Sequence, residues 1–426
     1  MKIYKYPSPL QWSEIIARQT FDHSDLTDRV ATLLADIRRR GDLAVIEMEE
    51  RFDHAHLDTL CVEESEIVAA EAALSPSLRD AIRVAYDNIY RFHKSQETSH
   101  SKVETAPGVV CWQKPVAIDK VGLYVPGGTA PLFSTVLMLA VPARIAGCRE
   151  VILCTPPDAQ GSVHPAILYA ARISGVTKVF KCGGVQAIGA MAYGTQSVPR
   201  VSKIFGPGNQ YVQMAKRLVS LSDVAIDMPA GPSEVAVIAD ETTHPAFAAA
   251  DFLSQAEHGV DSQALLFTTS EAFVEPFVEC VEEQLAALPR CEFARKALDN
   301  SRIVVLQNDE EMMALVNEYA PEHLIIQTAH YRDLSDRVRN AGSVFLGPYS
   351  PESAGDYASG TNHTLPTNGY AKAYSGVNLD SFMRKITFQE ISRSGLRQLG
   401  PTIMTMAEAE HLDAHSRAVG IRLQEK

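Results

Sequence analysis

Paired cysteines are the feature that this 426-residue sequence most clearly lacks. Its seven cysteines are scattered, and no two of them form a C-x-x-C pair. An odd number of dispersed cysteines argues against a disulfide framework and against a cysteine zinc site. We therefore expect a protein of the reducing cytoplasm. The seven positions are Cys61, Cys111, Cys148, Cys154, Cys182, Cys280 and Cys291.

Long hydrophobic runs and a surplus of basic residues are absent as well. No stretch of about 18 apolar residues occurs, and residues 1–20 contain no apolar core of a signal peptide. The formal net charge is −13 and the pI is near 5.5, so there is no overall basic footprint for nucleic acid. We expect neither a membrane nor a nucleic acid as a partner.

Strand-like and helix-like segments alternate from about residue 109 onward. Short β-branched runs predict buried strands, and the segments between them predict helices. Such alternation is typical of parallel sheets that helices cover on both faces. The predicted strands form two series, at residues 120–124, 150–154, 178–181 and 201–205, then at 234–239, 264–268, 303–306, 323–327 and 344–346. We expect an α/β fold with two incomplete Rossmann-like lobes.

The expected domain division follows these two series. An N-terminal segment covers residues 1–23. A first α/β lobe, formed by residues 24–124 and 233–377, carries the metal-ligating and catalytic candidates. A second α/β lobe, formed by residues 125–232, contributes the cofactor site. Residues 378–426 remain as a C-terminal tail.

The tail is expected to be helical and to hold a second subunit. Residues 380–387 and 391–399 are predicted to be short helices, and Pro401 opens a last helix that runs to about residue 423. A helical tail that leaves an α/β body is a common means of gripping a partner subunit. We therefore expect a dimer.

Three glycine-bearing loops follow predicted strands of the second lobe. They lie at Gly122–Gly128, Gly183–Gln186 and Phe205–Asn209. Glycine lets the backbone approach a phosphate closely, and the helix that follows favours an anion at its N-terminus. Each loop alone is also typical of an ordinary turn, but together they favour a nucleotide-like ligand at the carboxyl edge of the sheet. The G-x-G-x-x-G fingerprint is missing, so a dinucleotide would bind in an unconventional way.

A candidate metal site lies on one predicted helix that ends at Gly259. Helical spacing places Asp251, Gln255 and His258 on one face, at positions i, i+4 and i+7. An imidazole nitrogen together with amide or carboxylate oxygens can ligate a zinc-like ion. The alternative is a polar helix face that is turned to water.

Candidate proton-transfer groups occur where a predicted helix meets a strand. Glu322 and His323 are adjacent there, and a carboxylate beside an imidazole suits successive proton transfers. A solvated loop is the alternative. The glycine- and proline-rich stretch over residues 350–367 adds Asp356 and His363 as ligands or bases, because long ordered loops in α/β proteins tend to be functional.

Taken in order, these stretches closely resemble the histidinol dehydrogenase family. The resemblance extends from about residue 105 to the C-terminus, and the helical start fits it too. The matching stretches are VGLYVPGGTAPL at 121–132, FGPGN at 205–209, DMPAGPSE at 227–234, LSQAEHG at 253–259, YAPEHL at 319–324, YSPESAGD at 349–356, NHTLPT at 362–367 and LDAH at 412–415.

The resemblance implies a reaction, two cofactors and a set of site residues. The family oxidises L-histidinol to L-histidine through bound L-histidinal with two NAD⁺, as the last step of histidine biosynthesis. It is a zinc-containing homodimer, with one zinc per subunit and a C-terminal tail that completes the partner's active site. Its fold is of the aldehyde dehydrogenase class.

The family's functional residues carry over to this sequence as four sets. The implied zinc ligands are Gln255, His258, Asp356 and His415. The implied catalytic pair is Glu322, which activates water, and His323, which acts as the base. The implied NAD contacts are Tyr124, Gln186 and Asn209. The implied substrate contacts are Ser233, Gln255, His258, His323, Asp356, His363, Glu410 and His415.

One position departs from the family and three alternatives stay open. His411 stands between Glu410 and Leu412 where the family often has glycine, and its imidazole lies close in sequence to His415. The protein is alternatively a paralogue that oxidises a different amino alcohol, or an aldehyde dehydrogenase with a cysteine nucleophile, for which Cys182 is the candidate. A non-enzymatic two-lobed metal- or ligand-binding protein is the third alternative.

Overall fold

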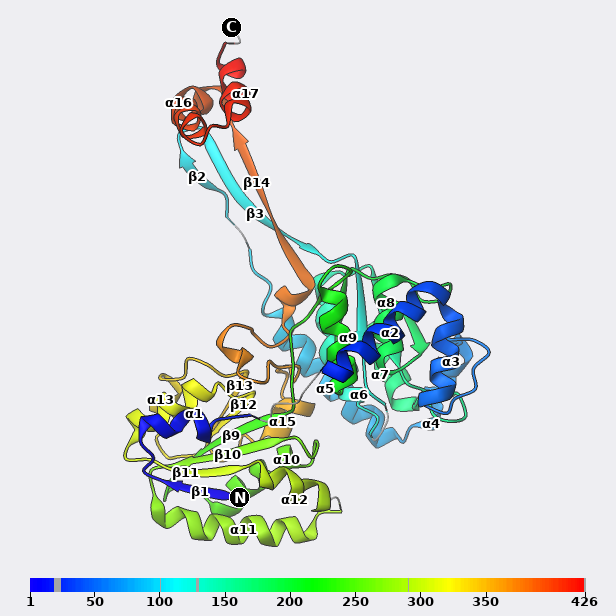
Figure 1. The fold of residues 1–426 in the computed structure, drawn as a ribbon, viewed down its shortest axis with the longest axis vertical. Coiled ribbons are helices and arrows are strands. Elements are labelled where there is room, and N and C mark those ends of the chain that lie inside the picture. Colours follow the sequence, from blue (N-terminus) through cyan, green and yellow to red (C-terminus); the bar gives the residue numbers. More distant parts are fainter. Residues whose placement is uncertain (19–23, 100, 128–129, 290, 425–426) are drawn as a thin grey trace.

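Two parallel sheets, one in each lobe, form the body of the structure, and a separate three-stranded sheet with the two C-terminal helices projects from this body as an arm (Figure 1). This computed structural model describes residues 1–18, 24–99, 101–127, 130–289 and 291–424. Every strand pair within the two sheets is parallel, so the expected α/β class is confirmed. In the described part of the chain, no helix combines the length and the apolarity needed to cross a membrane.

The larger sheet has six strands in the order β1-β11-β10-β9-β12-β13. Alternate residues of β9 enter different cores, because Val235 and Val237 face one side and Ala236 and Ile238 the other. Its strands are β1 (Lys2–Lys5), β9 (Glu234–Ala239), β10 (Gln263–Thr268), β11 (Arg302–Val305), β12 (His323–Ile326) and β13 (Ser343–Leu346). Helices α10 (Pro245–Ala256), α11 (Val274–Ala287) and α12 (Cys291–Asp299) supply side chains to the first core, and α1 (Trp12–Ile15), α13 (Asp309–Tyr319) and α14 (Tyr331–Ser335) to the second.

The smaller sheet has five strands in the order β6-β5-β4-β7-β8 and also lies between two cores. Its strands are β4 (Lys120–Tyr124), β5 (Glu150–Thr155), β6 (Lys178–Lys181), β7 (Lys203–Phe205) and β8 (Ala225–Ile226). Helices α4 (Glu64–Ala73), α5 (Pro76–Lys94), α6 (Phe133–Ala146) and α7 (Pro165–Ser174) share one core, and α2 (Ser24–Arg40), α3 (Asp42–Phe52), α8 (Gly184–Tyr193) and α9 (Gln210–Ser220) share the other. We refer to the two units as the six-stranded lobe and the five-stranded lobe.

The expected domain division needs correction for residues 24–124. Helices α2 to α5 pack on the five-stranded lobe, where Val30, Leu34 and Ile37 join the core of α8 and α9, and β4 is the central strand of that sheet. The N-terminal segment instead contributes β1 to the six-stranded sheet, where it pairs with β11. Helical periodicity predicts that a face is buried, but it does not say which of two sheets covers that face.

The prediction of a short helix over residues 380–387 is wrong, because residues 383–391 form a strand of the arm. Strand β14 (Met383–Ile391) pairs antiparallel with β3 (Val109–Ala117) over its whole length, and β3 also pairs with β2 (Val103–Ala106). Phe388 stacks on Trp112 with ring centroids 5.4 Å apart. The β-branched and aromatic residues of this segment gain their strand partner only from a segment that is distant in sequence.

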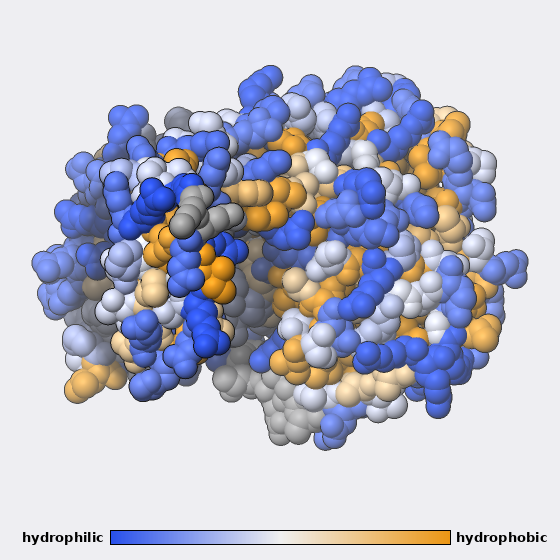
Figure 2. All heavy atoms as spheres, turned by 90° about the horizontal axis from the view of Figure 1, so that it is seen from above, coloured by the Kyte–Doolittle hydropathy of each residue, from blue (hydrophilic) through white to orange (hydrophobic). Residues whose placement is uncertain are grey.

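Two helices end the arm, so the expectation of a helical C-terminal region is confirmed. Helix α16 (Arg393–Ala409) and helix α17 (Asp413–Gln424) meet at residues 410–412. His411 adopts a left-handed backbone conformation there, with φ of 59°. Glycine takes that conformation without strain, whereas an L side chain such as that of His411 adopts it at a cost. Figure 2 views the molecule from above, from the end that carries this arm, and shows apolar side chains among polar ones at the surface.

The loop after β7 needs glycine at one position, and this requirement is testable. Gly206 has φ of 129°, and a Cβ atom there would lie 2.0 Å from the carbonyl oxygen of Tyr124. We expect Gly206→Ala to lower the free energy of unfolding by about 3 kcal/mol or more, because strain and a backbone clash add together. Urea denaturation measures the loss.

Gly147→Ala is the matched control for this substitution. Gly147 also has a positive φ, 86°, but among the described residues no atom lies within 4 Å of its would-be Cβ. The control should lose only the conformational term, about 1 kcal/mol. Equal losses in the two variants would contradict the proposed close approach of Gly206 to β4.

Candidate active site

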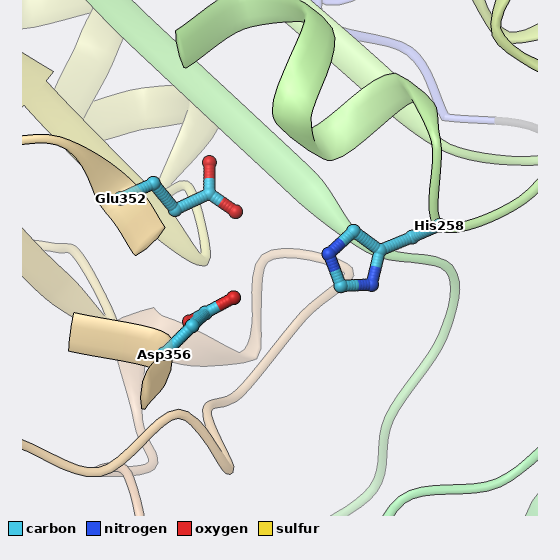
Figure 3. A group of neighbouring side chains, drawn as sticks. All are labelled: His258, Glu352 and Asp356. Atoms are coloured by element: carbon cyan, nitrogen blue, oxygen red, sulfur yellow. The ribbon is translucent and has the colours of Figure 1, made fainter. Parts of the chain in front are cut away.

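A cluster of acidic groups and imidazoles lies at one end of the six-stranded lobe. Each of His258, Glu352 and Asp356 offers a ligand atom, and these atoms all lie within 4.8 Å of one another. Figure 3 shows the two carboxylates and the imidazole pointing toward one another. The two carboxylates are buried and His258 is exposed, so the cluster lies at the edge of the protein interior.

Two helices place these side chains. Gln255 lies in the last turn of α10, which begins with Pro245 at its first turn. The helix ends at Ala256, so the predicted helical face of Asp251, Gln255 and His258 stops at Gln255, and His258 follows in the next turn of the chain. Helix α15 (Glu352–Tyr357) carries Glu352 and Asp356 four residues apart, so both project from one face. The two helices are joined by Asp251 of α10, whose carboxylate accepts a hydrogen bond from the backbone N–H of Glu352. Asp251 thus acts in the structure as a link between the helices.

The predicted pair Glu322 and His323 lies beside this cluster, at the start of β12. His323 is 4% exposed, and its Nδ1 lies 3.7 Å from Oε2 of Glu322 and 4.0 Å from Oε1 of Glu352. Its Nε2 lies 3.5 Å from Oδ1 of Asp356. Oε2 of Glu322 accepts hydrogen bonds from Nε2 of Gln255 at 3.2 Å and from a backbone N–H at 2.9 Å. The pair and the cluster therefore form one site.

Burial and mutual repulsion shift the acidity of these groups. Burial raises the pKa of Glu352 to about 8, and the charge of His323 opposes this shift. Burial also acts against the charged form of His323, but the carboxylates of Glu352 and Glu322 raise the pKa of the imidazole well above its usual value. Burial opposes ionisation of Asp356 as well, yet its contact with His323 lowers the pKa of that carboxyl. The positive charge of one imidazole thus compensates several carboxylates.

Four polar atoms at this site are buried and make no hydrogen bond to any described residue. They are Oε1 of Gln255, Nε2 of His323, Oε1 of Glu352 and Oδ1 of Asp356. Buried polar atoms without a partner are costly and call for a ligand, a water or an ion. Imidazole nitrogen with amide and carboxylate oxygens is a donor set that suits a divalent cation such as zinc. The residues present therefore fit a metal centre.

Two further substrate candidates, His363 and Ser233, lie near this cluster. Nδ1 of His363 is 2.8 Å from the carbonyl oxygen of Asp356, and its Nε2 is 3.0 Å from Oγ1 of Thr135 on α6. His363 thus bridges the six-stranded lobe to the five-stranded lobe. Ser233 is half-buried and directly precedes β9, whose first residue, Glu234, contacts the catalytic pair through its backbone.

The three cofactor candidates lie near the carboxyl ends of β4, β6 and β7: Tyr124 ends β4, Gln186 lies in the first turn of α8, and Asn209 is the N-cap of α9. The hydroxyl oxygen of Tyr124 accepts a hydrogen bond from the N–H of Gly184 at 3.2 Å, so two of the glycine loops touch. Nε2 of Gln186 donates to Oε1 of Glu49 at 2.9 Å, and Oδ1 of Asn209 caps helix α9. Part of the first loop, including Gly128, lies outside the described residues.

Glu410 and His415, the two candidates on the C-terminal tail, lie far from the acidic cluster of their own chain. Glu410 and His415 are exposed and lie at the far end of the arm, near the junction of α16 and α17 (Figure 1). Their predicted neighbours, Gln255 on α10 and His258 just after it, lie in the six-stranded lobe. A single chain therefore brings together Gln255, His258, Asp356 and the catalytic pair, but not the tail residues.

The cysteine-nucleophile alternative has no support in the structure. Cys182 is fully buried at the end of β6. Its hydrogen bond with Cys154 and its burial raise the pKa of the Cys182 thiol well above its usual value. The thiolate is the nucleophilic form of cysteine, and this environment disfavours it.

The sequence analysis misses two buried acids, one beside the acid–base pair and one beside a cofactor candidate. Glu352 belongs to the glycine- and proline-rich stretch over residues 350–367, in which the sequence indicates a role for Asp356 but not for Glu352. The signal was the spacing, because residues four apart on a short helix face the same way. Glu49 lies on α3 and accepts hydrogen bonds from Gln186 and from the N–H of Gly183. Its separation of 137 positions from Gln186 left no signal in the sequence.

Fold and site together define a two-lobed α/β enzyme with a candidate metal centre beside an acid–base pair. A family model described as histidinol dehydrogenase matches residues 16–423 of this chain. Histidinol dehydrogenase from Bacteroides thetaiotaomicron is 62% identical over 423 residues, which are 99% of each chain. The enzyme of that name from Photobacterium profundum is 53% identical and covers 94% of this chain and 90% of its own.

A solved structure agrees with these sequence relatives. The crystal structure of histidinol dehydrogenase from Elizabethkingia anophelis superposes with a TM-score of 0.97 at 51% identity, and covers 100% of this chain and 98% of its own. The chain belongs to the histidinol dehydrogenase family, and is an oxidoreductase.

The metal centre yields a direct prediction. His258→Asn should lower the zinc content of the purified protein at least tenfold at about micromolar free zinc, because an imidazole ligand is lost from a small donor set. Elemental analysis after dialysis measures the content. His56→Asn, which replaces an exposed histidine of the His54-Ala55-His56 stretch, is the control and should keep the zinc. Unchanged zinc in His258→Asn would remove that residue from the site.

Proposed function

We propose that this protein oxidises L-histidinol to L-histidine in two steps, through bound L-histidinal, with zinc and two NAD⁺ per turnover. The reaction would be the last step of histidine biosynthesis, and the cytoplasm its location. The proposal rests on buried side-chain atoms of Gln255, His323 and Asp356 that have no hydrogen-bond partner among the described residues and lie close to the carboxylate of Glu322.

The zinc ligands proposed for one site are Gln255, His258, Asp356 and His415, with one zinc per subunit. When bound, the zinc supplies a positive charge that holds the imidazole and the amine of the substrate. The acid cluster favours such a charge, because carboxylates attract a cation, and the same carboxylates raise the pKa of His323. A bound cation would compensate the carboxylates in place of His323, which could then accept a proton.

The first step needs a base at the alcohol oxygen. Nε2 of His323 takes the proton of the histidinol hydroxyl group. A hydride leaves the carbon that bears this hydroxyl group and passes to NAD⁺, and histidinal forms. The Nδ1 side of the ring faces Glu322 and the carbonyl oxygen of Glu234, which hold the ring in one orientation. Proton transfer by a positioned side chain contributes roughly 10²- to 10⁴-fold to such a step.

The second step needs an activated water. Glu322 takes a proton from water as the oxygen attacks the histidinal carbon, and His323 returns the proton of the first step to the former carbonyl oxygen, which gives the hydrated aldehyde. His323 then takes a proton from this hydrate as the second hydride leaves, and the carboxylic acid forms. Both hydrogen bonds to Glu322 fall on Oε2, so Oε1 is the oxygen proposed to accept the proton.

The glycine loops of the five-stranded lobe are the proposed NAD⁺ site. Tyr124, Gln186 and Asn209 lie at the carboxyl edge of the sheet, where parallel sheets of this kind bind ligands. Ser233, His363 and Glu410 are proposed as further contacts of the substrate. His363 contacts α6 of the same lobe, which favours a substrate held between the two proposed sites.

The tail residues give a reason for a homodimer. Glu410 and His415 are exposed at the end of an arm that projects from the body (Figure 1), so we propose that they complete the site of a second copy. Exposed apolar residues on α16 and α17 and the loop between them are consistent with such packing. They are Met406, Leu412 and Ile421.

The stoichiometry of NADH tests the proposed reaction. Zinc-loaded protein should form two NADH for each histidinol consumed, because the aldehyde is oxidised before it escapes. Absorbance of NADH and amino-acid analysis of the product measure the ratio. One NADH per histidinol would mean that the second step is misassigned, and activity only with other amino alcohols would favour the paralogue alternative.

The division of labour between the catalytic residues is separately testable. Glu322→Gln should reduce oxidation of supplied histidinal by about 10²-fold or more, because the amide cannot take the proton of water. Oxidation of histidinol to histidinal should fall by less than about tenfold, since His323 remains as the base. Single-turnover measurements of each half separate the two. Equal losses in both halves would refute the roles assigned to Glu322 and His323.

A further inference from the structure

Arg18 and Glu234 form a buried ion pair, and the backbone of Glu234 contacts the catalytic pair. Nε of Arg18 lies 2.6 Å from Oε1 of Glu234, and its Nη2 lies 2.8 Å from Oε2, so the contact is bidentate. The Glu234 side chain is 3% exposed and that of Arg18 is 17% exposed. A two-pronged contact of this type fixes the carboxylate in orientation as well as in position.

Arg18 is itself held at the end of α13. Its Nη2 also donates to the carbonyl oxygen of Tyr319 at 2.7 Å, and its guanidinium lies 4.2 Å from the centre of the Tyr319 ring. Tyr319 is the last residue of α13 and lies just before the catalytic pair in sequence. Arg18 therefore joins the segment that enters β9 to the segment that enters β12.

The backbone of Glu234 contacts both catalytic residues. Its N–H donates to Oε2 of Glu322 at 2.9 Å, and its carbonyl oxygen lies 3.4 Å from Nδ1 of His323. Its side chain has a second anchor, because the N–H of Asn368 donates to Oε1 at 2.7 Å. The backbone groups that contact the catalytic pair thus belong to Glu234, whose carboxylate is fixed by Arg18 and by the N–H of Asn368.

We propose that Arg18 is a positioning residue for Glu322, which acts by locking Glu234 and thereby the N–H group that holds the Glu322 carboxylate. The inference rests on the water-activating role proposed for Glu322. It gives the N-terminal segment a part in the reaction, although Arg18 touches neither substrate nor reacting atoms in this role.

The geometry predicts unequal effects on the two halves of the reaction. The two hydrogen bonds to Oε2 of Glu322 come from Glu234 and Gln255, so a shift of Glu234 removes one of them. His323 also loses its contact with the carbonyl oxygen of Glu234, which at 3.4 Å is the longer of the two, but it keeps its neighbours Glu352 and Asp356. Loss of Arg18 should therefore impair water activation more than removal of the alcohol proton.

The test compares Arg18→Met with a matched control on the same N-terminal segment. Arg18→Met should lower kcat for histidinal oxidation by about tenfold or more, and kcat for the histidinol half by less than about threefold, because small misplacements of a reacting group cost rate steeply. KM for histidinol and zinc content should stay within about twofold of the wild type, since the proposed ligands are untouched. Lys5→Met, which breaks the exposed Lys5–Glu271 ion pair, should leave both halves unchanged.

A second variant decides the matter if Arg18→Met does not fold. Arg18→Lys keeps the positive charge beside Glu234 but cannot make the bidentate contact, so the same selective loss is expected in smaller measure. Equal loss in both halves, in step with the folded fraction measured by circular dichroism, would show a purely structural role and overturn the inference. So would unchanged rates in a folded variant.

The two levels of the proposal fail in different ways. A wild-type protein that forms no NADH from histidinol or histidinal would refute the proposed function. An active wild type with an unchanged ratio of the two half-reactions in both Arg18 variants would refute only the positioning role.

Discussion

The arrangement of this protein depends on the burial of several carboxylates around one imidazole. Glu322, Glu352 and Asp356 surround His323, which is 4% exposed. Removing such charges from water is costly unless each has a compensating partner. The compensation comes from the charge of His323 and from hydrogen bonds that several elements donate. A bound cation would satisfy the atoms that still have no partner.

The two lobes carry different sets of candidate functional residues. In the six-stranded lobe the site lies at the amino ends of β9 and β12 and at the end of α10, where polar side chains replace the apolar core. In the five-stranded lobe the glycine loops lie at the carboxyl ends of the strands. His363, which contacts both α6 and the turn of Asp356, joins the two halves. A rigid junction of this kind lets two ligands meet in a defined orientation.

Local pattern accounts well for the elements and for the chemistry of single positions. The strands at 234–239 and 178–181 were predicted to the residue, because buried parallel strands are short β-branched runs. The pairing of Glu322 with His323 also follows from their adjacency. The helical face of Gln255 and His258 does not, because α10 ends at Ala256, before His258. The strand at 383–391 has no local signal either, because its partner β3 lies more than 250 positions away and its apolar residues stay partly exposed.

The sequence alone determined the α/β class, the position of most helices and strands, and the types of residue that carry the chemistry. These properties follow from periodicity and from side-chain chemistry, which act over a few residues. Only the tertiary structure decided that helices α2 to α5 cover the five-stranded sheet, that Glu352 joins the acid cluster, and that Arg18 reaches Glu234. Such contacts are selected by packing between distant segments, and no local pattern encodes which distant surface a buried face or charge will meet.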